Sequence, residues 1–233
     1  MRHAPPPLML FAAGFGTRMG ALTADRPKPM IPVAGVPLID RALALCDAAG
    51  IARVVVNLHY RGDQLAAHLA GRDVALAWER EEILETGGGM RAALPLLGDG
   101  PVLALNPDAV WTGENPLTRL MAEWDGDRMD CLVTLLPAAQ ALGHAGRDFL
   151  LGADGRIARA NGAVAYAYLG AQIVNPALLH EVPEKAFSLN RLWDMAIARG
   201  RAFGLVHRGG WCDVGTPEGI TQAEALLAEA AHA

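Results

Sequence analysis

Apolar residues in the N-terminal half fall into short continuous runs that alternate with segments of helical spacing. The runs lie at residues 8–13, 53–58, 74–78 and 101–105. Runs of this length bounded by glycine or polar residues indicate strands buried on both faces. Between them, helical spacing predicts helices over 38–49, 63–69 and 86–94, the last ending at Pro95. This alternation predicts an α/β fold with a mostly parallel central sheet flanked by helices.

The C-terminal half is less regular. Its pattern predicts strands over 131–136 and 164–174 and helices over 115–124, 188–199 and 217–231. A small β-hairpin is predicted where residues 149–151 and 156–158 flank the turn sequence Ala-Asp-Gly. Because the chain shows neither a repeat nor a low-complexity linker, we expect a single Rossmann-like domain over residues 1–233.

Composition narrows the class of protein. Hydrophobic residues make up 52% of the 233 residues, enough for a buried core, so a wholly disordered chain is excluded. The formal charge of −5 lacks the basic excess of a nucleic-acid binder. No apolar run reaches the roughly 18 residues of a membrane span. The three cysteines are too widely spaced for a zinc knuckle or a disulfide framework, so we expect a cytoplasmic protein.

Lysine is rare in this chain. Eighteen of the 20 basic residues are arginines, and the two lysines are Lys28 and Lys185. Lys28 lies between Pro27 and Pro29, which fix φ and stiffen an otherwise apolar loop. That setting is unusual for a solvated charge. Lys185 has no such setting, and we expect it on the surface.

Gly14 and Gly16 follow the first predicted strand, and Arg18 comes two residues later. Such glycines let backbone N–H groups approach an anion closely, although a structural turn would also explain the pair. No Gly-Lys-Ser/Thr follows, so this is not a Walker loop. Met19 stands where a dinucleotide fingerprint has its third glycine, which argues against a nicotinamide-dependent oxidoreductase. An arginine fork and a point cation on a stiff frame suit polyphosphate chemistry.

Two aspartates at distant points of the chain are further candidates for a functional site. Asp108 comes after the fourth predicted strand, and Asp213 lies within Trp-Cys-Asp-Val-Gly-Thr at residues 211–216. Taken alone, the first could be a turn residue and the second a helix N-cap. Polar groups beyond the carboxyl ends of parallel strands converge on one crevice, which would bring Asp108 close to the glycine loop.

Residues 12–19 (Ala-Ala-Gly-Phe-Gly-Thr-Arg-Met) and 26–33 (Arg-Pro-Lys-Pro-Met-Ile-Pro-Val) together resemble the signature of sugar-1-phosphate nucleotidylyltransferases. The Gly-x-Gly-x-Arg and Pro-Lys-Pro elements at this separation are specific in combination, and the resemblance covers nearly the whole chain. It implies a nucleotide-diphospho-sugar transferase fold and an enzyme that joins an NTP to a sugar 1-phosphate with release of pyrophosphate. It also implies a nucleotide-binding half, 1–114, and a sugar-phosphate-binding half, 115–233, that carries the hairpin and the C-terminal helix.

The resemblance further implies residue roles. Arg18 and Lys28 would be catalytic, Asp108 and Asp213 would hold Mg²⁺, and Asp148 and Gly170 would bind the sugar, although a strand bulge would also explain Gly170. Nucleotide binding is implied for Ala12, Ala13, Gly14, Gly16, Thr17, Glu85, Gly87, Gly88 and Asn106. UTP and N-acetylmuramate 1-phosphate are the substrates we expect, with a guanosine nucleotide and mannose or heptose 1-phosphate as the alternative. We expect a monomer, and neither nucleic acid nor membrane as partner.

Two departures from the family pattern keep alternatives open. Pro107 stands between Asn106 and Asp108, where relatives usually carry Gly or Ala. Since proline lacks an N–H, a catalytically weakened nucleotide-sugar-binding protein is the competing hypothesis. Ser188 stands where similar relatives tend to carry lysine, which leaves the acceptor open. For Asn57 and His59 we expect a core or loop role.

Overall fold

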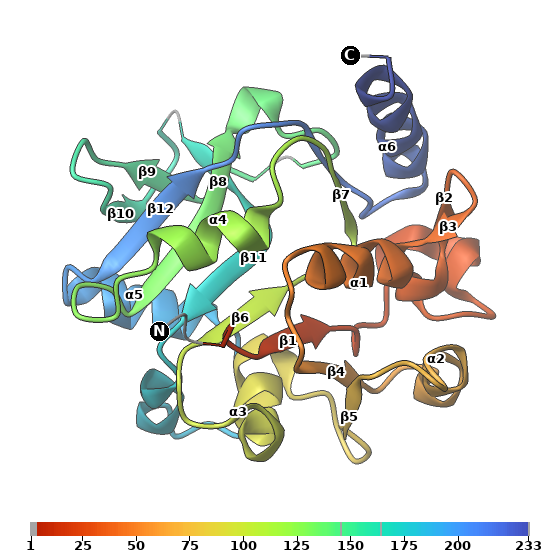
Figure 1. Ribbon diagram of the computed structural model, residues 1–233, viewed down its shortest axis with the longest axis horizontal. Coiled ribbons are helices and arrows are strands. Elements are labelled where there is room, and N and C mark those ends of the chain that lie inside the picture. The colour runs from red at the N-terminus through yellow and green to blue at the C-terminus, as the bar shows by residue number, and fades with distance from the viewer. Residues whose placement is uncertain (1–3, 145, 164, 233) are drawn as a thin grey trace.

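The computed structural model describes residues 4–144, 146–163 and 165–232. Its central sheet has the order β10-β9-β11-β6-β1-β4-β5, with β8 on β11 and β12 on β8 (Figure 1). The strands of this sheet are β1 (Leu8–Phe11), β4 (Val54–Leu58), β5 (Ala75–Trp78), β6 (Val102–Leu105), β8 (Cys131–Pro137), β9 (Phe149–Leu151), β10 (Ile157–Arg159), β11 (Tyr166–Val174) and β12 (Ala202–Val206).

The strands β6-β1-β4-β5 run parallel and form the part of the sheet predicted from the apolar runs. The first three residues of β1 and all of β4 are buried, which explains why their sequences lack the alternation of a half-exposed strand. β11 then pairs antiparallel with β6 and with β8. The prediction of an α/β domain with a mostly parallel central sheet is confirmed, and the sheet crosses the predicted boundary at residue 114.

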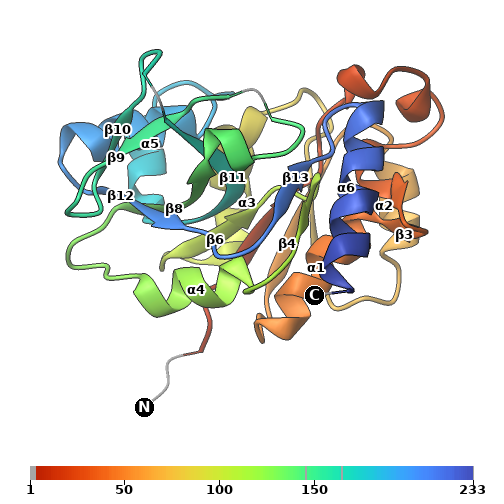
Figure 2. The same cartoon turned by 90° about the horizontal axis from the view of Figure 1, so that it is seen from above.

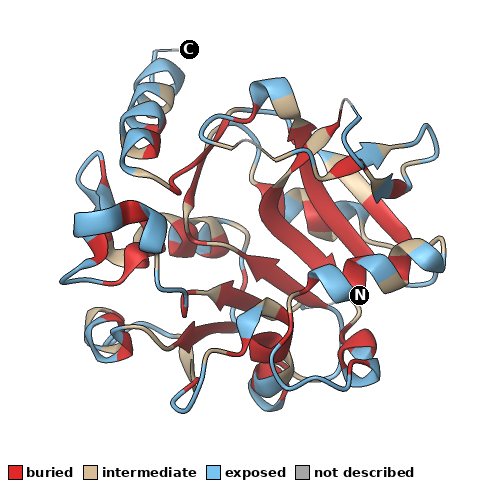
Figure 3. Cartoon of the chain, turned by 180° about the vertical axis from the view of Figure 1, so that it is seen from behind, coloured by how far each residue is buried: buried red, intermediate tan, exposed pale blue. Residues whose placement is uncertain are grey.

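Helices cover both faces of the sheet (Figure 2). They are α1 (Leu38–Ala48), α2 (Gly62–His68), α3 (Glu85–Leu97), α4 (Pro116–Glu123), α5 (Asn190–Ala198) and α6 (Pro217–Ala230). α3 and α5 pack with Met9 and Val55 on one face, whereas α1 and α4 pack with Leu8 and Val54 on the other. Figure 3 shows the buried residues concentrated in the central strands and in the helix faces against them. In the described ranges, every helix falls short of the length and apolarity needed to span a lipid bilayer.

Short elements complete the edge of the domain. β13 (Trp211–Asp213) pairs antiparallel with β7 (Ala109–Trp111), and α6 packs beside them. A two-residue pair, β2 (Pro32–Val33) and β3 (Val36–Pro37), and the 3₁₀ turns η1 (Thr17–Thr23), η2 (Lys28–Met30), η3 (Ala138–Gln140) and η4 (Pro176–Glu181) lie in connections. The β7–β13 pairing brings the segments of Asp108 and Asp213 together, because Asp108 directly precedes β7 and Asp213 ends β13.

Several predicted boundaries were wrong. α3 runs to Leu97 with Pro95 inside its last turn, where the missing N–H costs one hydrogen bond while Leu97 becomes buried. The strands β7, β12 and β13 were not predicted. Val164, the first residue of the strand predicted over 164–174, lies outside the described residues, and β11 begins at Tyr166.

Candidate active site

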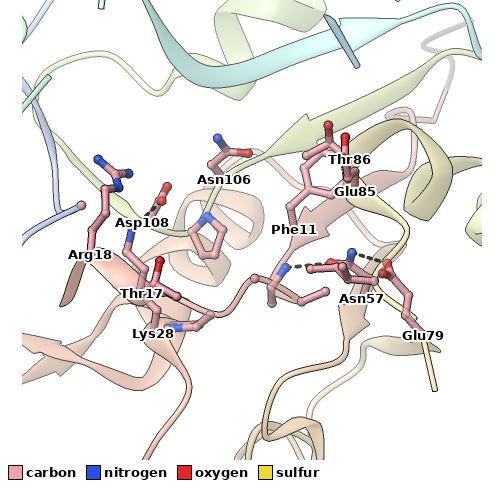
Figure 4. A pocket seen from close by; sticks show the side chains of 18 residues that line it. Phe11, Thr17, Arg18, Lys28, Asn57, Glu79, Glu85, Thr86, Asn106 and Asp108 are labelled. Carbon is pink, nitrogen blue, oxygen red and sulfur yellow. Dashed lines mark hydrogen bonds and ion pairs between the residues drawn. The ribbon is translucent and has the colours of Figure 1, made fainter. Parts of the chain in front are cut away.

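A cavity of about 320 Å³ lies beyond the carboxyl ends of β1, β4 and β6, as the parallel sheet predicted (Figure 4). Residues from the loop after β1, the turn η2, the start of α3 and the turn after β6 line it. The predicted site residues among the lining are Ala12, Ala13, Gly14, Gly16, Thr17, Arg18, Lys28, Glu85, Asn106 and Asp108. Segments far apart in the sequence therefore share one cavity.

Gly16 explains why the glycine loop and the Pro-Lys-Pro segment occur together. Its backbone is left-handed, with φ of 64°. A Cβ at this position would lie 2.8 Å from the Cβ of Lys28 and 3.0 Å from the Cγ2 of Thr23. The Thr23 hydroxyl donates to the Gly16 carbonyl at 3.1 Å. Only glycine satisfies both the conformation and the contact, so Gly16 lets Lys28 lie against the loop.

We expect Gly16→Ala to destabilise the fold and to displace Lys28. The left-handed backbone alone costs an L-residue about 1–2 kcal/mol, and the Cβ contact adds to it. Chemical denaturation measures the effect, with Gly14→Ala as the matched control because a Cβ there meets nothing within 4 Å. Equal stability of the two variants would contradict this role of Gly16.

Lys28 is held in an ion pair, and its side chain is largely shielded from solvent. It begins η2 directly after Pro27, and only 9% of the residue is exposed. Its Nζ donates to Oδ2 of Asp108 at 2.7 Å. The stiff loop predicted from the flanking prolines thus delivers a compact cation to the cavity. Lys185 is on the surface, as predicted, and pairs with Glu81 and Glu82.

Asp213 is not among the residues that line the cavity, but it lies close enough to Lys28 and Asp108 for their charges to act on it. Its side chain is 11% exposed, and its Oδ2 is 3.8 Å from Nη1 of Arg18. Burial raises the pKa of Asp213, and the charge of Asp108 raises it further, whereas Lys28 and Arg18 oppose the shift. The Val214 N–H donates to the Asp108 carbonyl at 2.8 Å, which ties the two carboxylate segments together.

The carboxylates of Asp108 and Asp213 fit a magnesium ion. Burial and the nearby charge of Asp108 both raise the pKa of Asp213, and a dication between the two carboxylates would offset that unfavourable charge. Mg²⁺ typically takes one or two carboxylates together with water and phosphate oxygens. Among the described residues, no group of three or more His, Cys, Asp or Glu could supply a site from protein alone.

Pro107 lines the cavity without disturbing the hydrogen bonds around it. The Asn106 N–H donates to the Gly170 carbonyl at 2.8 Å, and the Asp108 carbonyl accepts from Val214. These bonds use groups on either side of Pro107, so the proline removes none of them.

Gly87 and Gly88 are not brought to the cavity lining. Both N–H groups donate to the Phe187 carbonyl, at 2.8 and 3.0 Å. A Cβ on Gly87 would lie 2.3 Å from the Phe187 ring, and one on Gly88 would lie 2.4 Å from the Lys185 carbonyl. Close packing of the segment before α5 therefore explains both glycines, and it caps the first N–H groups of α3. Their contact with a nucleobase stays a prediction.

Asp148 and Gly170 also lie outside the lining. Gly170 has φ of 88° at the point where the β11–β8 register shifts, so the bulge interpretation describes its backbone. Burial alone would raise the pKa of Asp148, but the adjacent His144 and the hydrogen bond from the Tyr168 N–H together lower it. The sugar-binding role of both residues stays a prediction.

Sequence reasoning missed three polar residues of the cavity, which are Asn57, Glu79 and Thr86. Asn57, for which a core or loop role was expected, and Glu79 both line it and are almost completely buried. They come from the carboxyl ends of the neighbouring strands β4 and β5. That shared position was the signal that could have found them.

The chain is similar to known enzymes that transfer nucleotidyl groups. Residues 8–175 match the family model of the MobA-like NTP transferase domain. The chain is 40% identical to N-acetylmuramate alpha-1-phosphate uridylyltransferase of Caulobacter vibrioides, over 99% of this chain and 100% of the relative. It is 31% identical to the enzyme of that name from Neisseria meningitidis serogroup B, over 94% and 96% of the two chains.

Solved structures share the fold. HddC from Yersinia pseudotuberculosis, in a crystal structure with GMP-PN, superposes with a TM-score of 0.75 at 19% identity. The superposition covers 94% of this chain and 98% of HddC. At 19% identity, this similarity shows a shared fold only.

Proposed function

The chain belongs to the MobA-like NTP transferase family, and we propose that it transfers the uridylyl group of UTP to N-acetylmuramate α-1-phosphate. It is a nucleotidyltransferase by family, and the products of the proposed reaction are UDP-N-acetylmuramate and pyrophosphate. The observation that carries the proposed substrates is the 40% identity to the Caulobacter uridylyltransferase across nearly the full length of both chains. Such a reaction would belong to the recycling of peptidoglycan sugars.

The proposed chemistry is an in-line displacement. A phosphate oxygen of the sugar 1-phosphate attacks the α-phosphorus of UTP, and the bond from that phosphorus to the bridging oxygen of the β-phosphate breaks. Pyrophosphate leaves with the bridging oxygen. Because the attacking phosphate is already ionised at neutral pH, no general base is needed. Catalysis then depends on positioning and on charge stabilisation.

Arg18 and Lys28 supply the fixed cations of this reaction. The exposed guanidinium of Arg18 suits the β- and γ-phosphates, which it can bind through two N–H groups at once. The buried ammonium of Lys28 suits the α-phosphate and the incoming phosphate, since it is a compact point charge on a stiff turn. Incoming phosphates would compete with Asp108 for Lys28.

We propose that the enzyme depends on Mg²⁺ held by Asp108 and Asp213. When bound, the ion supplies positive charge to the phosphate oxygens. The two side chains would meet it with carboxylate oxygens, and the pairing of Lys28 with Asp108 keeps one of these oxygens near the cavity beforehand. We further propose a cytoplasmic protein, because the three described cysteines are all free and buried, as suits a reducing compartment. A monomer remains the oligomeric state that we propose from the sequence.

A substrate panel tests the proposal. Pyrophosphate release is measured with each common NTP against the 1-phosphates of N-acetylmuramate, N-acetylglucosamine, glucose, mannose and heptose, with and without Mg²⁺. We expect the highest kcat/KM for UTP with N-acetylmuramate 1-phosphate. A preference for GTP with mannose or heptose 1-phosphate would favour the alternative substrates. Nucleotide binding without turnover would favour the weakened binding protein.

A further inference from the structure

A continuous chain of hydrogen bonds connects the glycine loop with the start of α3. Figure 4 shows the part of it that involves Asn57 and Glu79. The Ala12 N–H donates to Oδ1 of Asn57 at 2.7 Å. The Nδ2 of Asn57 donates to Oε1 of Glu79 at 2.7 Å. The Leu84 N–H donates to Oε2 of Glu79, also at 2.7 Å. Two side chains thus bridge backbone groups that belong to different walls of the cavity.

The bridge lies in the interior of the protein. Asn57 is 3% exposed and Glu79 is 5% exposed. Across the described part of the chain, the side-chain ion pairs do not include Glu79. A buried carboxylate without a cation is costly unless N–H groups satisfy it. Here the side-chain amide of Asn57 and the backbone N–H of Leu84, the N-cap residue of α3, do so.

The third glycine of the Gly-Gly-Gly run at residues 87–89 accommodates the same bridge. A Cβ on Gly89 would lie 2.6 Å from Oε1 of Glu79 and 3.1 Å from Nδ2 of Asn57. The absence of a side chain at this position lets the carboxylate and the amide meet beneath α3. Glycine at position 89 therefore leaves room for the hydrogen bond between Asn57 and Glu79.

The bridge lies at the end of the cavity away from its cations. Figure 4 shows Arg18, Lys28 and Asp108 at one end, and Asn57 and Glu79 at the other. Phosphates belong at the cationic end. The nucleoside part of an NTP is therefore left with the end that Ala12 and the start of α3 enclose.

We propose that Asn57 and Glu79 are positioning residues that fix the distance between the glycine loop and the start of α3. By doing so they preorganise the two walls that bind the nucleoside part of the NTP. This inference rests on the proposed function, and it concerns affinity for the NTP rather than the chemical step.

The direction of each hydrogen bond makes the inference testable. Both backbone partners, Ala12 and Leu84, are donors, so the two side chains must provide an acceptor at each end and one donor between them. In Glu79→Gln, the amide has a single oxygen for two donors, and one donor faces another however Asn57 is turned. In Asn57→Asp, two carboxylates meet. The double exchange Asn57→Asp/Glu79→Gln restores every donor–acceptor pair, with the central bond reversed, and keeps the net charge.

The experiment compares these three variants with wild type and with Glu81→Gln. The control makes the same chemical change at an exposed glutamate, whose side chain is 88% exposed. Steady-state KM for UTP, KM for the sugar phosphate and kcat are measured, together with the Kd of UTP by calorimetry and the thermal midpoint. Each single variant should raise KM and Kd for UTP about tenfold and leave kcat and the other KM within about twofold. The double variant should return within about threefold of wild type.

Rescue in the double variant supports positioning, even if the single variants fail to fold. Wild-type affinity in the single variants would overturn the inference. It would also be overturned if the double variant folded but stayed impaired, because Glu79 would then act through its own charge on the ligand. Failure of the double variant to fold would overturn it too, because the reversed bond would then not replace the original one. Failure of the proposed function has a different signature, because the wild-type enzyme itself would then turn over no UTP.

Discussion

Lys28→Ala is expected to lower kcat by about 10²–10³-fold, the usual effect of removing one preorganised charge from a transition state. The ammonium lies in the cavity at 2.7 Å from Asp108, on a turn fixed by Pro27. No other lysine is available to replace it, since Lys185 is on the surface. Stopped-flow or coupled measurement of pyrophosphate release gives the change in kcat.

The fold should largely survive this substitution. Alanine leaves Asp108 without its cation, but that side chain is 28% exposed and can be hydrated, so the free energy of unfolding should fall by no more than about 1–2 kcal/mol. Lys28→Arg should also lose activity, because a planar fork does not reproduce a point charge beside one phosphate. Lys185→Ala is the matched control with unchanged kcat. Full activity of Lys28→Ala would rule out the catalytic role.

The architecture and the cationic half of the cavity could be predicted because their signals are local. The apolar run before Gly14 predicts β1, and the order of strands and helices then places Arg18 and Asp108 near one edge of the sheet, while the flanking prolines single out Lys28. Each of these side chains follows a strand or lies in a motif of unusual stiffness. Local pattern and parallel-sheet geometry were sufficient to bring them together.

Asn57 and Glu79, in the opposite half of the cavity, lie at the ends of predicted strands, but their contacts are not apparent in the sequence. Glu79 begins the run Glu-Arg-Glu-Glu, whose other three residues are exposed, so its sequence resembles a solvated charge cluster. The need for glycine at Gly87 comes from the ring and carbonyl of Phe187, and that at Gly88 comes from the Lys185 carbonyl, both far along the chain. Proline at position 95 predicts the end of a helix, but burial of Leu97 keeps the last turn of α3 helical. In each case a tertiary contact overrides the local preference.

Asp213→Asn is expected to reduce kcat/KM by about 10²-fold or more while making the ligand-free protein more stable. The pKa of Asp213 is raised in the folded protein by burial and by Asp108, so folding opposes its ionisation. Its contribution to stability is fully present below the unfolded-state pKa near 3.8 and is lost as the pH rises through the higher folded-state pKa. At neutral pH the wild-type carboxylate therefore costs stability, and the neutral amide does not.

Thermal unfolding of both proteins between pH 4 and pH 8 checks this expectation. Without Mg²⁺ the variant should have the higher midpoint at pH 7, and the difference should shrink towards acid, where wild-type Asp213 becomes protonated. Mg²⁺ with UTP should then raise the wild-type midpoint more than that of the variant, because a bound dication favours the ionised carboxylate. Asp99→Asn, at an exposed site, should show neither effect. A less stable Asp213→Asn protein that responded normally to Mg²⁺ would mean that Asp213 serves the fold, and that the cation site lies elsewhere.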